Sequence, residues 1–218
     1  MFDTAAARRM MVDCQVRTAD VTNPDLIGAM LDVPRELFMP KGLTDRAYLD
    51  SDIALGPGRV LLKPMVLAKL IQAGQMGPSD HVLDVGCGTG YSSAIMARLA
   101  GFVVALEQDT GLAGAAKQAL SAAGAANNVT VVMGPLTAGW SASGPYDFIL
   151  INGASEITPE SYAGQLKPSG RLACIYKPGP AGKAMIYRLV EGHLLGRPIF
   201  EASAPVLPGF AAPEAFVF

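Results

Sequence analysis

The sequence lacks the features of a disulfide-stapled, metal-binding or nucleic-acid-binding protein. Its three cysteines are odd in number and widely spaced (Cys14, Cys87 and Cys174), and it has only two histidines. This spacing suits neither a disulfide framework nor a zinc cluster, so we expect no metal site. The net charge of −2 argues against a surface that binds nucleic acid electrostatically. Only 17% of the residues are charged and 50% are apolar, which excludes a disordered chain.

The sequence also lacks long apolar runs. Charges, glycines or prolines interrupt each run before it reaches a membrane-spanning length, so we expect no membrane partner. The first residues, MFDTAAARRMMVD, contain neither an apolar core nor a cleavage site, so we expect no secretory signal. Without such a signal, a reducing cytoplasm is the simplest location for the free thiols. We predict that the three cysteines are buried.

The chain length of 218 residues suits one domain. We expect it to comprise a helical N-terminal extension with a substrate-side loop over 1–78, an α/β core over 79–180 and C-terminal strands over 181–218. In the extension, ARRMMVDCQV reads as helical, and Asn23 followed by Pro24 predicts the start of a second helix. We expect this helix to continue through VPREL to Phe38, before Pro40 stops it.

From residue 80, short apolar runs alternate with helical patterns. This alternation predicts an α/β, doubly wound, Rossmann-like sheet that is mostly parallel, with both faces covered. The predicted strands are HVLDVG, FVVALE, VTVVMG, YDFILING and GRLACIYK, and the predicted helices are YSSAIMARLA, GLAGAAKQALSAAG and ITPESYAGQL. The tail is less regular and could add one or two antiparallel strands, with GFAAPEAFVF as the last.

The sharpest motif is LDVGCGTGYSSA, at residues 83–94. Here Asp84 lies near the end of a strand, and three glycines allow a ligand to approach the backbone. Glu107 ends the next strand, at a position that reaches ribose hydroxyls in doubly wound folds. The predicted ligand-binding residues of this motif are Asp84, Gly86, Cys87, Gly88, Gly90 and Glu107.

Two cofactors could use such a loop. A dinucleotide requires Gly or Ala three residues after the second glycine, where this chain has the bulky Tyr91. S-adenosylmethionine fits the pattern better, because an acid near the loop can meet its ammonium group. A turn without any ligand is the remaining interpretation.

At this point the chain resembles the protein-L-isoaspartate O-methyltransferase family. The resemblance spans about residues 10 to 180 and is carried by LDVPRELFMP, AYLDSDIALGPG, LDVGCGTGYSSA, FVVALE, the Gly139-Trp140 pair, PYDFILI and QLKPSGRL. It implies a class I methyltransferase that uses S-adenosyl-L-methionine. The implied substrate is a protein or peptide with an isoaspartyl residue, or a small carboxylate.

The segment GPGRVLLKP departs from the family pattern. The family has hydroxyl residues beside the cofactor and the incoming carboxylate, where this chain has Val60 and Leu62. Arg59 and Lys63 replace neutral polar residues, and we hypothesise that one of them holds the substrate carboxylate instead. The alternative is that both are solvated surface charges. The resemblance thus makes Arg59, Val60, Leu62 and Lys63 the active-loop positions.

Two further departures lie at the cofactor side. The family's Gly-Asp-Gly, whose acid side reaches the adenine, is replaced by Gly134, Pro135 and Leu136, and Asn152 begins a segment that replaces an alanine-rich loop. Three functions remain open: a carboxyl methyltransferase of the isoaspartyl repair type, a methyltransferase for another substrate, and a catalytically silent cofactor-binding or partner-binding protein.

Overall fold

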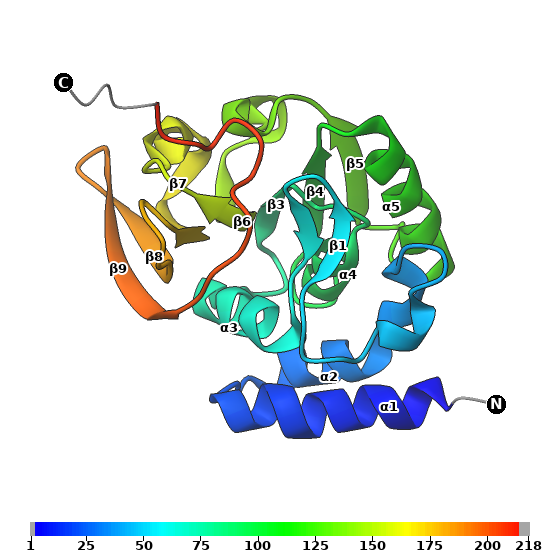
Figure 1. Cartoon of the computed structure of the whole chain (residues 1–218). Helices are drawn as coiled ribbons and strands as arrows, with labels where there is room; N and C mark the ends of the chain where they lie inside the picture. The colour runs from blue at the N-terminus through cyan, green and yellow to red at the C-terminus, as the bar shows by residue number, and fades with distance from the viewer. Residues whose placement is uncertain (1–2, 214–218) are drawn as a thin grey trace.

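A computed structural model describes residues 3–213. Its centre is a seven-stranded sheet in the order β5-β4-β3-β6-β7-β8-β9. The first five strands of this order run parallel, and β8 and β9 complete the edge in antiparallel pairing (Figure 1). The sheet confirms the predicted α/β fold and its mostly parallel character.

The five strands predicted between residues 80 and 180 all form. Their bounds are His81–Val85 for β3, Phe102–Glu107 for β4, Val129–Met133 for β5, Tyr146–Ser155 for β6 and Leu166–Tyr176 for β7, followed by Lys183–Val190 for β8 and His193–Glu201 for β9. Strands β3, β4 and β6 are buried over nearly their whole length. Continuous apolar runs of this kind are expected where both faces of a parallel sheet are covered.

The helices cover one face of the sheet. They are α1 (Thr4–Met11), α2 (Pro24–Asp32), α3 (Pro64–Gly74), α4 (Tyr91–Met96) and α5 (Thr110–Ala122). All five contribute buried side chains to a single apolar cluster with that face. Because apolar side chains gain about 25 cal/mol for each Å² removed from water, this cluster is the main source of stability.

The opposite face is covered differently. Among residues 3–213, its apolar cluster contains no side chain from the five α-helices. Short 3-10 turns and a C-terminal segment, which supplies Leu207 and Phe210, pack there instead. The predicted helix ITPESYAGQL is one of these 3-10 turns, over Glu160–Gln165.

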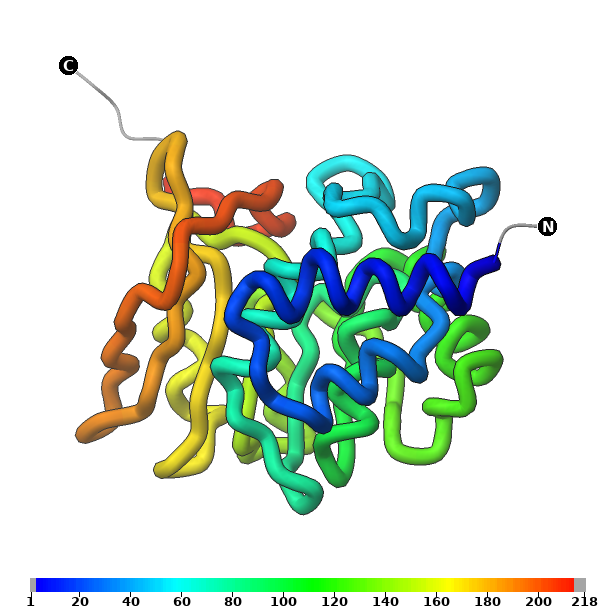
Figure 2. The backbone as a smooth tube through the Cα atoms, turned by 90° about the horizontal axis from the view of Figure 1, so that it is seen from below, coloured from blue at the N-terminus to red at the C-terminus, as the bar shows by residue number. Residues whose placement is uncertain are grey.

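The first helix of the N-terminal extension, α1, lies on the outside of the helical layer (Figure 2). Helix α1 continues into a π-helical turn over Val12–Val16. Helix α2 begins as predicted, because the Asn23 side chain accepts a hydrogen bond from the Leu26 amide. The predicted continuation to Phe38 is wrong: α2 ends at Asp32, and a separate 3-10 turn spans Arg35–Phe38. Pro34 explains the break, because a residue before proline is pushed towards extended backbone, as Val33 is.

The segment GPGRVLLKP forms part of a small β-hairpin. Strand β1 (Ile53–Gly56) pairs antiparallel with β2 (Arg59–Leu61), and helix α3 follows directly. At the base of the hairpin, the Asp52 carboxylate accepts a 2.7 Å hydrogen bond from the Lys63 amide. The hairpin lies in front of β3 and β4 in Figure 1. Neither the hairpin nor α3 was predicted from the sequence.

The C-terminal part confirms two antiparallel strands, β8 and β9. GFAAPEAFVF, predicted as the last of one or two such strands, falls partly outside the described residues. Its described part, 209–213, has no strand. No helix within residues 3–213 is long and apolar enough to cross a membrane.

Candidate functional site

The glycine loop lies at the carboxyl end of β3, between that strand and α4. Gly86, Gly88 and Gly90 all have positive φ, as the sequence pattern predicts. The Gly86 and Cys87 amides donate to the carbonyl of Leu106 in the next strand, which fixes the loop against β4. The loop is therefore a rigid turn at the edge of the sheet where doubly wound proteins bind ligands.

Asp84 is the centre of a buried polar network on β3. Its Oδ2 accepts hydrogen bonds of 2.5 Å from the Ser92 hydroxyl and 2.6 Å from the Ser93 hydroxyl. The Ser92 oxygen in turn accepts a 2.7 Å hydrogen bond from the Asn152 amide. The network thus joins the ends of β3 and β6 to the first turn of α4.

Two oxygens of this network have no hydrogen-bond partner among residues 3–213. They are Oδ1 of Asp84 and Oδ1 of Asn152, and both are buried. Burial raises the pKa of Asp84 to about 6, although the Ser92 and Ser93 hydroxyls oppose the rise. Unpartnered buried acceptors are rare, and an ammonium group is a donor that would satisfy them.

Glu107 is the second buried acid, at the end of β4. Its Oε2 accepts from the Gly88 amide at 2.9 Å, and its Oε1 accepts from the amides of Gln108 and Asp109 at 2.8 and 3.1 Å. Three backbone donors therefore hold the carboxylate at the mouth of the glycine loop. The pairing of β3 with β4 brings this acid and Asp84 to the same end of the sheet, as predicted.

Arg59 supplies the remaining hydrogen bonds to the Glu107 carboxylate. Its Nη1 and Nη2 donate to Oε1 and Oε2, each at 2.6 Å, in a bidentate ion pair. The Arg59 side chain is only 6% exposed and that of Glu107 is fully buried. The interpretation of Arg59 as a solvated surface charge is therefore wrong. The carboxylate that it holds in this structure belongs to the chain itself.

Apolar side chains fill the rest of the glycine loop's concave side. A Cβ atom built on Gly88 would lie 2.8 Å from Cδ1 of Leu55. One built on Gly86 would lie 3.4 Å from Nη2 of Arg59, 3.4 Å from Leu207 and 3.5 Å from Leu136. The space that the glycines leave open is thus occupied by side chains from the hairpin and from the C-terminal segment.

The other active-loop positions are dispersed. Val60 is half-buried on β2, and Leu62 is buried in the helical core, where its carbonyl accepts a hydrogen bond from buried Arg35. The Lys63 side chain is half-buried and borders a separate cavity with Met65, Val66, Gly182, Glu201 and Ser203. Leu62 is therefore a core residue, and Lys63 is the active-loop cation without an ion pair among residues 3–213.

The remaining predicted cofactor positions differ in their surroundings. Leu136 is fully buried, Pro135 is exposed, and Gly134 packs beside Trp140. Gly90 faces α5 rather than the loop mouth, because a Cβ there would meet Leu120 and Ala116. These contacts make Gly90 a packing residue.

The cysteines divide into two kinds. Cys87 and Cys174 are buried as predicted, whereas Cys14 is exposed, so the prediction was wrong for that residue. Burial raises the pKa of the Cys87 thiol well above its usual range, which does not suit a nucleophile. Among the described residues there is no group of three or more His, Cys, Asp or Glu side chains able to hold a metal ion.

The polar groups of these residues suit S-adenosylmethionine, but the space at the site suits only one end of this cofactor. At the β3–β6 end, the free oxygens of Asp84 and Asn152 suit the ammonium group of an amino acid. At the β4 end, Glu107 suits a pair of ribose hydroxyls, but Arg59 and Leu55 occupy the approach to it. The ribose of the cofactor would therefore fit beside Glu107 only after the Arg59 and Leu55 side chains have moved.

Several residues of the site were not predicted from the sequence. Ser92 and Ser93 lie eight and nine residues after Asp84, and two hydroxyls at the start of an apolar helix were the available signal. Leu55 and Leu207 gave no local signal, because their role depends on contacts between segments that are distant in the chain.

Known proteins resemble the chain over most of its length. The family model described as protein-L-isoaspartate(D-aspartate) O-methyltransferase matches residues 7–186. A protein-L-isoaspartate O-methyltransferase of Methylorubrum extorquens is 37% identical over 200 residues, which cover 92% of this chain and 85% of that protein. A protein-L-isoaspartate O-methyltransferase of Pelotomaculum thermopropionicum is 38% identical over 168 residues, which cover 77% of this chain and 73% of that protein.

Solved structures agree on the fold. A protein-L-isoaspartate O-methyltransferase aligns with a TM-score of 0.81 at 24% identity, covering 93% of this chain and 66% of the other. A putative enzyme of the same kind from Plasmodium falciparum, in complex with S-adenosyl-L-homocysteine, aligns with a TM-score of 0.76 at 16% identity, covering 95% of this chain and 99% of the other. At these identities the structures support the fold alone. The family model and the 37–38% identical relatives carry the assignment further: the chain belongs to the protein-L-isoaspartate(D-aspartate) O-methyltransferase family.

Proposed function

We propose that the protein is an S-adenosylmethionine-dependent O-methyltransferase that acts on the carboxylate of an isoaspartyl residue in a protein or peptide. The observation that carries this proposal is the pair of buried acids, Asp84 and Glu107, at the ends of adjacent parallel strands with the glycine loop between them. The acids and the loop are arranged as a nucleoside with an amino-acid tail requires.

Each end of the site has its own task. Asp84 and Asn152 would hold the ammonium group with their free oxygens, and Ser92 and Ser93 orient the Asp84 carboxylate for it. Glu107 would hold the ribose, since three backbone amides keep its carboxylate in place. When bound, S-adenosylmethionine supplies an electrophilic methyl group.

The protein needs no general base for this reaction. A carboxylate has a pKa near 4, so the substrate is already ionised at neutral pH. The protein's contribution is then to bind and orient the two reactants, which accounts for a large part of the rate enhancement of many enzymes. Lys63 is our candidate for holding the substrate carboxylate, since its ammonium group has no ion pair among the described residues, whereas Arg59 is engaged by Glu107.

The test is transfer of a labelled methyl group to an isoaspartyl peptide, with the aspartyl peptide of the same sequence as control. Incorporation into the isoaspartyl peptide alone, as a base-labile ester, is the expected result. Asp84→Ala is the matched inactive variant, because it removes the buried acid and leaves the glycine loop intact. Equal labelling of both peptides, or none, would contradict the proposed substrate.

A second candidate function is favoured by a specific observation. Val60 and Leu62 provide no hydroxyl for a substrate carboxylate, and Leu62 is turned into the core. Losing one such hydrogen bond costs roughly 1.5–3 kcal/mol. A methyltransferase for a different substrate, such as a small carboxylate, would tolerate the loss. Labelling of small carboxylates but not of the peptide would identify this case.

The location and partners follow from the proposed function. Exposed Cys14 and buried Cys87 and Cys174 are free thiols, which suits the reducing cytoplasm. Damaged proteins in that compartment would be the partners. The near-neutral net charge of −2 favours proteins over nucleic acid as the substrate.

A further inference from the structure

The ion pair between Arg59 and Glu107 lies at the position proposed for the ribose. The two guanidinium nitrogens donate to the two carboxylate oxygens at 2.6 Å, and the backbone amides of Gly88, Gln108 and Asp109 donate to the same two oxygens. The carboxylate thus accepts five hydrogen bonds, which leaves no acceptor position for a ribose diol.

The guanidinium also occupies the space beside the carboxylate. Its Nη2 lies 3.4 Å from a Cβ built on Gly86, the first glycine of the loop. Leu55, from the same hairpin, lies over Gly88. The hairpin thus places one cation and one apolar side chain where a nucleoside would need contact with the backbone.

The base of the hairpin is anchored in the helical core, where Ile53 and Leu61 are buried. Its two strands form a separate two-stranded sheet, and such hairpins are marginally stable by themselves. Gly56, at the end of β1, and Gly58, in the turn, both have positive φ and are exposed. Beyond the turn, the hairpin borders the C-terminal segment, where a Cβ on Gly58 would lie 3.4 Å from the Val206 carbonyl. Among the described residues, the Arg59 side chain makes the hydrogen bonds that join the hairpin to the seven-stranded sheet.

We propose that Arg59 is an intramolecular competitor of the cofactor, so that the Arg59–Glu107 ion pair must open before ribose hydroxyls can bind Glu107. The inference rests on the cofactor of the proposed function. Charge-assisted bidentate bonds are roughly twice as strong as those from neutral hydroxyls, so the closed arrangement is favoured. The apparent dissociation constant is the intrinsic constant divided by the open fraction. A site that is open one-tenth of the time therefore binds about tenfold more weakly.

The test is calorimetric binding of S-adenosylhomocysteine to the wild-type protein and to Arg59→Gln. The substitution removes the charge, while the three backbone amides still hold Glu107. We expect the variant to bind at least about tenfold more tightly. We also expect the unliganded variant to unfold at a lower temperature, because it has lost a buried ion pair.

Two further variants make the result specific. Arg59→Lys keeps the charge but cannot form the bidentate pair, so its affinity should lie between those of the wild type and Arg59→Gln. Arg171→Gln is the matched control, because it removes a partly buried ion pair with Asp80, which precedes β3 and so lies at the opposite end of that strand from the glycine loop. It should lower stability without changing the affinity. If Arg59→Gln does not fold, Arg59→Met, which keeps the length of the side chain, takes its place.

The outcomes separate this inference from the proposed function. Tighter binding by Arg59→Gln without methyl transfer to any carboxylate would support the inference and overturn the function. Equal or weaker binding by Arg59→Gln, with methyl transfer by the wild type, would overturn the inference and leave the function standing. If neither protein binds S-adenosylhomocysteine, both are overturned.

Discussion

The Thr89 hydroxyl donates a 2.7 Å hydrogen bond to the carbonyl of Phe38. Thr89 belongs to the glycine loop and Phe38 to the 3-10 turn Arg35–Phe38 of the N-terminal extension, so one buried contact joins the candidate site to the helical layer. The adjacent ring contact between Phe38 and Tyr91, with centroids 5.5 Å apart, reinforces the same junction. The position of the loop thus depends on the extension as well as on the sheet.

Replacing Thr89 with valine should weaken this junction. The shape is kept, but the buried Phe38 carbonyl loses its donor, so we expect the free energy of unfolding to fall by about 1–3 kcal/mol. Urea denaturation followed by fluorescence measures the change. Thr130→Val, at an exposed position on β5, is the control and should have little effect. Equal effects of the two substitutions would show that the hydrogen bond has no special role.

The pH dependence of stability should reveal buried Asp84. Its pKa is about 6 in the folded chain, against about 3.9 for an aspartate in an unfolded one. Between these values the folded state keeps a proton that the unfolded state has released, so this group's contribution to stability falls as the pH rises from about 4 to 6. At neutral pH the ionised group destabilises the fold by an amount on the order of 2–3 kcal/mol.

Asp84→Asn removes this titration. Relative to the wild type, the variant should therefore gain stability as the pH rises from about 4 to 7.5, and the curves should diverge mainly below about pH 6.5. Denaturant unfolding at a series of pH values measures both proteins. Parallel curves across the range would contradict the raised pKa.

Adding a methyl group at Gly153 should disturb the contact between β6 and the C-terminal segment. A Cβ there would lie 2.7 Å from Leu207, and the Leu207 amide donates to the Ala154 carbonyl beside it. We expect Gly153→Ala to lower the free energy of unfolding by about 1–3 kcal/mol, as overpacking does.

The matched experiment adds Leu207→Ala to the same chain. If the loss comes from this contact, the double variant should be more stable than the sum of the two single changes, by about 0.5–3 kcal/mol. Gly164→Ala serves as the control, because a Cβ there meets no atom within 4 Å. Additive effects in the double variant would place the strain elsewhere.

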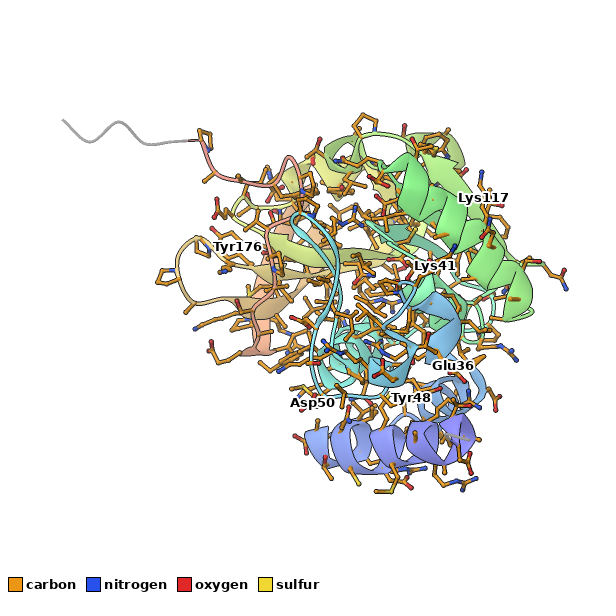
Figure 3. All side chains as sticks on the ribbon, turned by 45° about the vertical axis from the view of Figure 1, so that its right-hand side comes forward. Glu36, Lys41, Tyr48, Asp50, Lys117 and Tyr176 are labelled. Carbon is orange, nitrogen blue, oxygen red and sulfur yellow. The ribbon has the colours of Figure 1, made fainter. Side chains whose placement is uncertain are left out.

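Lys63 should bind the substrate carboxylate. Lys63→Met keeps much of the aliphatic stem and removes the charge, so we expect the KM for an isoaspartyl peptide to rise about tenfold, equivalent to about 1.4 kcal/mol. The affinity for S-adenosylhomocysteine should not change. Lys117→Met, on the exposed face of α5 (Figure 3), is the control for a general loss of positive charge. Identical KM values for the two variants would remove Lys63 from the substrate site.

The helical extension shows where prediction from sequence was less complete. Local rules found the start of α2 at Asn23 and Pro24, but not the separate turn over Arg35–Phe38. Tyr48 donates a hydrogen bond to Glu36, and the two residues lie next to each other in Figure 3. Such a contact joins residues on different turns, so no local pattern predicts it.

The sequence by itself determined the α/β alternation and the glycine loop with its two acids. These features depend on periodicity and on glycine's backbone freedom, which are local properties. Only the tertiary structure decided what surrounds Glu107. Arg59 is 48 residues away along the chain, and its partner could have been solvent, substrate or this carboxylate. Burial decided between them, because a guanidinium removed from water needs hydrogen-bond acceptors, and the hairpin brings this one to the Glu107 carboxylate.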